Sequence, residues 1–190
     1  MATAFDATSF RSKLQYGGAR PNLYRVIVSF PSDVADVVEE FTFMCRSASL
    51  PGMTVGQVQV PYFGRMIKFS GDRTFDDWSV RVINDEDFVV RNAFEAWQNR
   101  LAMLDYSTPA IENALAVGGH EFLYVDIEVT QLAKDGHGEL KKYNLKKAWP
   151  VAIGPIELAY DANDQIEEFD VTFAYDYFTT DKIEGLSVSA

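Results

Sequence analysis

The carboxylates of this sequence are the side chains that come closest to a catalytic arrangement. Asp72, Asp76 and Asp77 stand near a second acidic group, Asp85-Glu86-Asp87. Paired carboxylates can exchange protons with a substrate, as in glycoside hydrolysis. Acidic residues also cap helices and hydrate surfaces, which requires no substrate. A hydrolase that uses Asp76 and Asp77 is therefore an alternative hypothesis, and it predicts an activity that is lost in Asp76→Asn or Asp77→Asn.

Ligands for a transition metal are scarce. The chain has two histidines, His120 and His137, both beside glycines in predicted loops, and one cysteine, Cys45. A zinc site needs several converging His, Cys or carboxylate ligands. Cys45 follows Phe43 and Met44 in an apolar run, so a small buried side chain is the simpler interpretation. We expect no metal site.

The segment Asp161-Ala162-Asn163-Asp164 begins like a calcium-binding loop. The pattern then fails, because Ile166 stands where the loop needs Gly and Thr172 where it needs Glu. An Asx-rich hairpin turn explains the segment better. Glycine-rich phosphate-binding and dinucleotide-binding motifs are absent, as is the Gly-x-Ser-x-Gly nucleophile elbow. We expect no cofactor and no enzymatic activity.

The charge balance argues against tight binding of nucleic acid. The sequence has 28 acidic and 17 basic residues, for a formal net charge of -11. Its basic pairs are Lys141-Lys142 and Lys146-Lys147, which protect a strand edge as plausibly as they bind phosphate. An acidic surface aids solubility, and it also suits a channel along which DNA slides without sticking.

Segments that would place the chain in or across a membrane are not visible. The apolar runs fall short of the roughly 20 residues that span a bilayer. The first ten residues lack the basic and apolar regions of a secretory signal, and a single cysteine cannot form a disulfide within the chain. We expect a soluble protein that stays in a cell or in a particle assembled there.

The apolar pattern predicts mostly strands. Runs rich in β-branched and aromatic residues are separated by Gly, Pro and Asx turns, while Val90, Phe94, Trp97 and Leu101 recur at helical spacing. The predicted fold class is mainly β, an antiparallel β-sandwich or half-barrel with one flanking α-helix. We expect a helix over residues 88–104, a loop over 105–120, a break at Trp149-Pro150, and strands over 23–30, 38–48, 75–83, 122–130, 139–148, 153–160 and 169–177.

The pattern over residues 53–69 predicts a long hairpin or a protruding loop, with a turn or bend at Tyr62-Phe63-Gly64-Arg65. Its apolar residues show no clean one-sided pattern in the sequence. Apolar side chains that no core position requires are typical of a contact element. We therefore treat this hairpin as a candidate interaction surface.

Several motifs, in this order and spacing, resemble the tail tube proteins of contractile-tailed, T-even-like myovirus bacteriophages. The resemblance covers residues 19–178, and its most specific part is the run that begins at Ser70 and ends at Trp78. The motifs are Ala19-Arg20-Pro21-Asn22-Leu23-Tyr24, Ser70-Gly71-Asp72-Arg73-Thr74-Phe75-Asp76-Asp77-Trp78, Asn84-Asp85-Glu86, Phe94-x-x-Trp97, Trp149-Pro150 and Asn163-x-Gln165-Ile166-Glu167-x-Phe169-x-Val171-Thr172.

The resemblance implies a structural virion protein. Subunits of this family form hexameric rings whose sheets join into one continuous β-barrel, and the rings stack into the inner tail tube. The implied partners are other copies of the chain, the tail sheath protein, and the baseplate and tail-terminator proteins. Phage DNA would pass through the lumen into the host without specific binding, after assembly of the tail in the host cytoplasm. The expected domains are an N-terminal arm over 1–18, one tail-tube domain over 19–180 and a C-terminal tail over 181–190.

Within this scheme the predicted hairpin contacts the next ring. The residues expected at that contact are Val58, Val60, Tyr62, Phe63 and Arg65. A tight turn at Gly71-Asp72-Arg73 would place Asp72 and Arg73 at a subunit boundary. A local ion pair from Arg73 to Asp76 or Asp77 is the alternative for that arginine.

Two further hypotheses stay open. The chain could form the inner tube of a phage-derived contractile injection or secretion device, which carries no genome. It could also be a monomeric β-sandwich binding module that uses Tyr62 and Phe63 to hold a ligand such as a carbohydrate, and it would then be a stable monomer that the ligand stabilises against heat.

Overall fold

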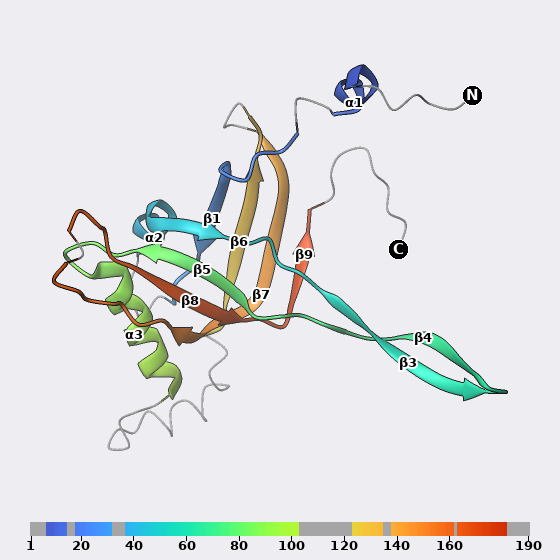
Figure 1. Ribbon diagram of the computed structural model, residues 1–190. Coiled ribbons are helices and arrows are strands. Elements are labelled where there is room, and N and C mark those ends of the chain that lie inside the picture. Colours follow the sequence, from blue (N-terminus) through green and yellow to red (C-terminus); the bar gives the residue numbers. More distant parts are fainter. Residues whose placement is uncertain are drawn as a thin grey trace.

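The structure of the chain is a computed structural model that describes residues 7–14, 18–31, 37–102, 123–134, 138–161 and 163–181 (Figure 1). Within this part antiparallel strands dominate, which confirms the predicted fold class. The elements are α1 (Ala7–Lys13), β1 (Tyr24–Val28), α2 (Val38–Met44), β2 (Cys45–Ala48), β3 (Thr54–Tyr62), β4 (Arg65–Thr74), β5 (Trp78–Ile83), α3 (Val89–Ala102), β6 (Val125–Leu132), β7 (Glu139–Ile153), β8 (Glu168–Ala174) and β9 (Tyr177–Thr180).

The long strand β7 connects two sheets. Six strands follow the order β1-β6-β7-β8-β5-β2, and a seventh, β9, also pairs with β7. The first part of β7 pairs with β9 between Tyr143 and Lys146, and the last part pairs with β8. A bulge separates the two parts, because Leu145 pairs with Ile127 whereas Ala148 pairs with Val125. The strand therefore bends at Lys147, whose φ is +54°.

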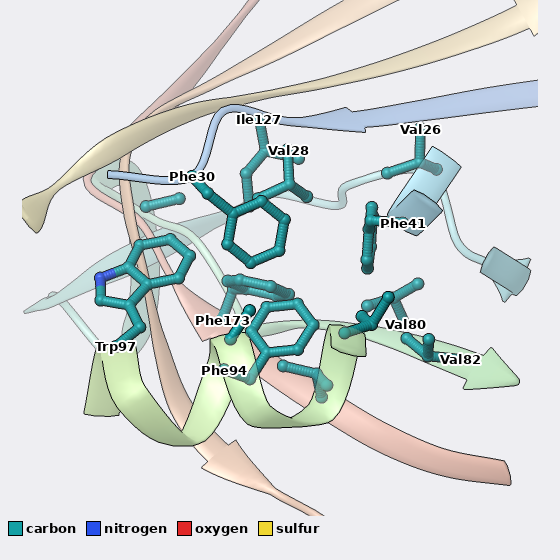
Figure 2. Close-up of a cluster of buried hydrophobic side chains, with 14 of the residues drawn as sticks. Val26, Val28, Phe30, Phe41, Val80, Val82, Phe94, Trp97, Ile127 and Phe173 are labelled. Atoms are coloured by element: carbon teal, nitrogen blue, oxygen red, sulfur yellow. The ribbon is translucent and has the colours of Figure 1, made fainter. Parts of the chain in front are cut away.

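The core lies where the two sheets and α3 meet (Figure 2). Alternate residues of the strands point into it, as the period of a β-strand requires. Aromatic rings fill its centre, with Phe30 and Phe94 5.1 Å apart and Phe94 and Phe173 5.8 Å apart between ring centroids. The aliphatic side chains around these rings include Val26, Val28, Val80, Val82 and Ile127.

The principal helix, α3, lies where the sequence predicted it. The carboxylate of Asp85 accepts a hydrogen bond from the backbone N–H of Val89 at 3.3 Å, which satisfies one free donor of the first turn. Phe94 and Trp97 are fully buried, and the indole N–H of Trp97 donates to the carbonyl oxygen of Leu123 at 2.9 Å. This contact attaches the last turns of α3 to the segment that leads into β6.

The strand predicted over 38–48 is wrong in its first seven residues. They form α2, and only β2 (Cys45–Ala48) is extended. Val37 and Phe41, four residues apart, are buried, while Glu39 and Glu40 are exposed, which is a helical pattern. Thr42 supports the helix by donating its hydroxyl hydrogen to the carbonyl oxygen of Val38 at 2.8 Å.

The predicted break at Trp149-Pro150 is also wrong. Both residues lie inside β7, where Pro150 pairs with Phe173 next to a shift in register. A proline is tolerated in a strand at such an irregularity, because its missing N–H removes no regular ladder bond. The strand predicted over 153–160 is absent. β7 ends at Ile153, and the residues that follow are irregular.

The last predicted strand, over 169–177, is divided. β8 ends at Ala174 and β9 begins at Tyr177, and the two strands pair with different parts of β7. The chain therefore leaves one sheet and enters the other within two residues.

Candidate functional site

The hairpin of β3 and β4 projects from the body as an arm (Figure 1). In the described part of the chain these two strands pair with each other and with no other strand. All residues of the two strands are exposed except Gly71, which is half-buried. A two-stranded hairpin on its own is marginally stable in water. The arm is thus the element of this fold that most needs an external partner.

The arm is rooted between two paired strands of the body. The chain runs from β2 through the arm into β5, and β2 and β5 are antiparallel neighbours. Trp78, the first residue of β5, is buried and donates its indole N–H to the carbonyl oxygen of Ser49 at 2.6 Å. This bond ties the two legs of the arm together at its base.

One face of the arm is apolar. Directly paired residues of an antiparallel hairpin share a face, and here Val58 pairs with Phe69, Val60 with Ile67 and Tyr62 with Arg65. The opposite face is polar near the base and carries Gln57, Gln59, Lys68 and Ser70, with Pro61 and Met66 closer to the tip. The sequence-based interpretation, which found no one-sided pattern, is corrected by this register.

The tip of the arm is a two-residue turn with an unfavourable residue in it. Phe63 has φ +45° and Gly64 has φ +75°, the conformation that hairpin turns reserve for Asn-Gly or Asp-Gly. A bulky side chain disfavours this region of φ. Phe63 is nevertheless 90% exposed, and among the described aromatic rings it contacts only that of Tyr62, edge to face at 4.6 Å between ring centroids. The turn therefore presents a large apolar side chain at a local energetic cost.

Two glycines allow the strands to approach closely at the base of the arm. The register shifts between Val55 and Gln57, so that one extra residue of β4 bulges opposite β3. A Cβ on Gly71 would lie 3.2 Å from the backbone of Gly56, which is too close for an ordinary contact. The bulge and the missing side chains permit a strong local twist, which aims the arm.

The predicted tight turn at Gly71-Asp72-Arg73 is wrong, because these residues lie inside β4. Arg73 pairs with Val55 in the ladder, and both Asp72 and Arg73 are exposed at the root of the arm. In the described residues no ion pair joins Arg73 to Asp76 or Asp77. The five residues predicted for a ring contact lie on the arm, and the contact itself stays a prediction. The pairing register places Ile67 and Phe69 on the same apolar face, which the sequence pattern did not single out.

The other candidate sites do not assemble into a centre. No group of three or more potential metal ligands converges within the described ranges, and His120 and His137 lie outside them. Burial raises the pKa of the Cys45 thiol to about 12, so the thiol stays protonated at neutral pH and is a poor nucleophile. Asp76 and Asp77 are both exposed. Among the described helices none is long and apolar enough to cross a membrane.

Sequence comparisons with known proteins all match the chain to one family. The family described as phage tail tube protein matches residues 19–181. The chain is 35% identical to tail tube protein gp19 of Enterobacteria phage T4 over 161 residues, which cover 84% of this chain and 90% of that protein. The corresponding protein of Enterobacteria phage T6 is 36% identical over the same coverage.

Solved structures share the fold at low sequence identity. A chain of the anti-feeding prophage baseplate superposes with a TM-score of 0.61 at 10% identity, covering 87% of this chain and 97% of that one. A chain of the PVC sheath-tube complex, an extracellular contractile injection system in its extended state, gives 0.57 at 14% identity, with 94% and 99% covered. At these identities the likeness concerns the fold alone.

Proposed function

We propose an assembly for this chain from one premise, which is that the chain belongs to the phage tail tube protein family. It is a structural protein of the phage tail and not an enzyme. We propose that its copies join into hexameric rings, and that the rings stack into the inner tube of a contractile tail. The observation that carries this proposal is an exposed, one-sided apolar arm on a body whose β1-β6-β7-β9 sheet has two edges that pair with no other described strand.

The free edges support closure of a ring. The sheet that holds β1, β6, β7 and β9 ends at β1 on one side and at β9 on the other. Its neighbouring strands are all antiparallel, so β1 and β9 run in opposite directions. The β9 edge of one copy can therefore pair with the β1 edge of the next and continue the antiparallel pattern. A sheet closed in this way into a continuous β-barrel leaves no exposed edge.

The arm supports stacking. We propose that Val58, Val60, Tyr62, Phe63 and Arg65 contact the next ring, and that Asp72 and Arg73 lie at a subunit boundary near the root of the arm. Large exposed apolar surfaces mark interaction sites in soluble proteins. Aromatic and arginine side chains are also the ones that most often dominate interface energetics.

The face of the same sheet that points away from the core suits the lumen. The bulk of the subunit packs on the opposite face, so a closed ring has room for it only on the outside. On this proposed lumen face, Lys142 is bound to Glu128 at 2.6 Å and Lys146 is bound to Asp126 at 2.5 Å. A wall of paired charges offers DNA few free cations, so phage DNA can pass into the host without being retained.

The proposed partners and organisation follow the family. We propose that the tube contacts a tail sheath protein, and baseplate and tail-terminator proteins at its ends, and that it assembles in the host cytoplasm. The solved neighbours described as baseplate and sheath-tube chains come from assemblies of that kind. We further propose one tail-tube domain over residues 19–180, flanked by extensions over 1–18 and 181–190.

Negative-stain electron microscopy of the concentrated protein tests the assembly. We expect rings and hollow tubes from the natural chain, and no stacking from Tyr62→Asp plus Phe63→Asp. Asn92→Asp plus Asn99→Asp is the matched control, since it adds the same charge at exposed positions of α3. Should the natural chain stay monomeric at every concentration, even after addition of a tube or baseplate seed, the assembly is refuted and a monomeric binding module takes its place.

A further inference from the structure

A groove of about 700 Å³ lies at the body end of the β5–β8 pair, away from the root of the arm. Its walls are the residues that follow β7, the residues that precede β8, and side chains from β2, β5 and β8. The members that matter here are Arg46, Arg81, Glu157, Leu158, Ile166 and Glu167.

The groove combines exposed apolar side chains with excess negative charge. Leu158 is 80% exposed and Ile166 is 70% exposed, although both are large and apolar. Both arginines are already paired, Arg81 with Asp170 through two contacts of 2.8 and 2.9 Å, and Arg46 with Glu168. The groove has four carboxylates, including Glu157 and Glu167, and two arginines, so it has a net charge of 2 − 4 = −2.

The arm has the complementary surface. Over residues 54–74 it carries Arg65, Lys68 and Arg73 against Asp72, a net charge of 3 − 1 = +2 in a chain whose total is −11. The remaining residues therefore carry −11 − 2 = −13. The apolar face of the arm and the exposed ring of Phe63 can pack against Leu158 and Ile166. The arm thus carries the positive charge and the apolar surface that complement the negative charge and the exposed apolar side chains of the groove.

The arm cannot fill the groove of its own chain. Trp78, beside the root of the arm, pairs with Phe173, whereas Ile83, at the other end of β5, pairs with Glu168 of the groove. The arm leaves the body at the Trp78 end and extends away from it (Figure 1). The two surfaces therefore lie at opposite ends of one strand pair.

We propose that this groove is the receptor for the β3–β4 arm of a second copy of the chain. The inference rests on the proposed tube function and names the partner of the arm within it. Because donor and receptor are different surfaces, the contact is head-to-tail and leaves a free arm and a free groove at each step. Such a contact repeats without limit, as a stacked tube requires.

Complementation between two defective full-length chains tests the proposal. The arm variant is Tyr62→Asp plus Phe63→Asp, and the groove variant is Leu158→Lys plus Ile166→Lys, which places positive charge opposite the basic arm. All four positions are exposed, so both chains are expected to fold, which circular dichroism checks. Tyr160→Lys plus Asn163→Lys is the matched control, because both residues are exposed in the same loop, do not line the groove and add the same charge.

We expect each variant alone to need at least a tenfold higher concentration than the natural chain before tubes form. The control should assemble like the natural chain. A 1:1 mixture of the two variants retains one intact arm and one intact groove, so it should form a complex that stops after one stacking step. Analytical ultracentrifugation measures the size of that complex. High salt should weaken it, since the contact joins opposite charges.

Two results would overturn the receptor assignment while leaving the tube function intact. In the first, the groove variant forms tubes at the same concentration as the control. In the second, both variants fail alone and the mixture forms no complex. Failure of the natural chain to form tubes on a seed is a different result, because it removes the proposed function and the receptor assignment together.

Discussion

Lys147 shows how a single backbone angle shapes the subunit. The residue has φ +54° at the bulge where β7 passes from one sheet to the other. Its backbone N–H points to a carboxylate oxygen of Asp126, 3.4 Å away, and the same carboxylate binds Lys146. A side chain in this region of φ costs about 1 kcal/mol, which glycine avoids. The bend is thus held by local contacts against the preference of the residue.

We predict that Lys147→Gly raises the free energy of unfolding by about 1 kcal/mol, because it removes this conformational cost. Urea denaturation monitored by circular dichroism measures the change. Lys146→Gly is the control, since it removes an ion pair at the neighbouring strand position and should destabilise the protein. Equal effects of the two substitutions would show that the backbone angle is not the cause.

Phe63 presents the same conflict at the tip of the arm, where the residue that would suit the turn is asparagine. We predict that Phe63→Asn slows hydrogen exchange of the arm amides in the free chain, because Asn-Gly fits the two positive φ angles. It should at the same time raise the concentration needed for tube assembly. Stability and assembly would then change in opposite directions, which a purely structural role for Phe63 does not produce.

At the scale of elements, the arm depends on the glycines at its base. We predict that Gly71→Ala impairs tube assembly while leaving the melting temperature of the body nearly unchanged, because the added Cβ would displace the facing backbone of the arm and touches no core residue. Gly52→Ala is the matched control, since a Cβ there meets nothing within 4 Å. A fall in the melting temperature with Gly71→Ala alone would place the effect in the body.

The elements also show what the sequence can and cannot predict. α3 and most strands could be predicted because each presents a regular apolar period, and the turn near Phe63 could be predicted from the glycine at Gly64. The residues of α2 were misassigned because seven residues offer too few repeats to separate period 3.6 from period 2. The apolar face of the arm was missed because faces become apparent only from the pairing of β3 with β4, and the groove joins segments that are distant along the chain.

On the scale of the whole molecule, charge is unevenly distributed along the chain. The arm is basic, the remainder of the chain is acidic, and the proposed lumen face is balanced by ion pairs. The hydrogen bond from Lys142 to Glu128 raises the pKa of that lysine. Lys142 is therefore charged at neutral pH, and the carboxylate of Glu128 balances its charge. An acidic total alone, as considered from the sequence, is therefore not what we propose for the lumen.

We predict that tubes of Asp126→Asn plus Glu128→Gln retain DNA, because Lys142 and Lys146 lose their partners and can bind phosphate. Binding of a fluorescent single-stranded oligonucleotide to assembled tubes at low salt measures this, and high salt should abolish it. Glu86→Gln plus Asp87→Asn makes the same change in net charge at exposed positions before α3 and serves as the control. Equal retention of DNA by both kinds of tube would show that the ion pairs of Lys142 and Lys146 do not line the lumen.

The sharing of β7 between two sheets has a mechanical consequence. A load applied to one sheet reaches the other through covalent backbone, and not only through side chains that can slip past one another. The close-packed core between the sheets and α3 resists compression and passes the remaining load to α3. A subunit built in this way should transmit thrust along its length as a stiff body and should rupture in one step when pulled, a behaviour that force spectroscopy on the single chain can record.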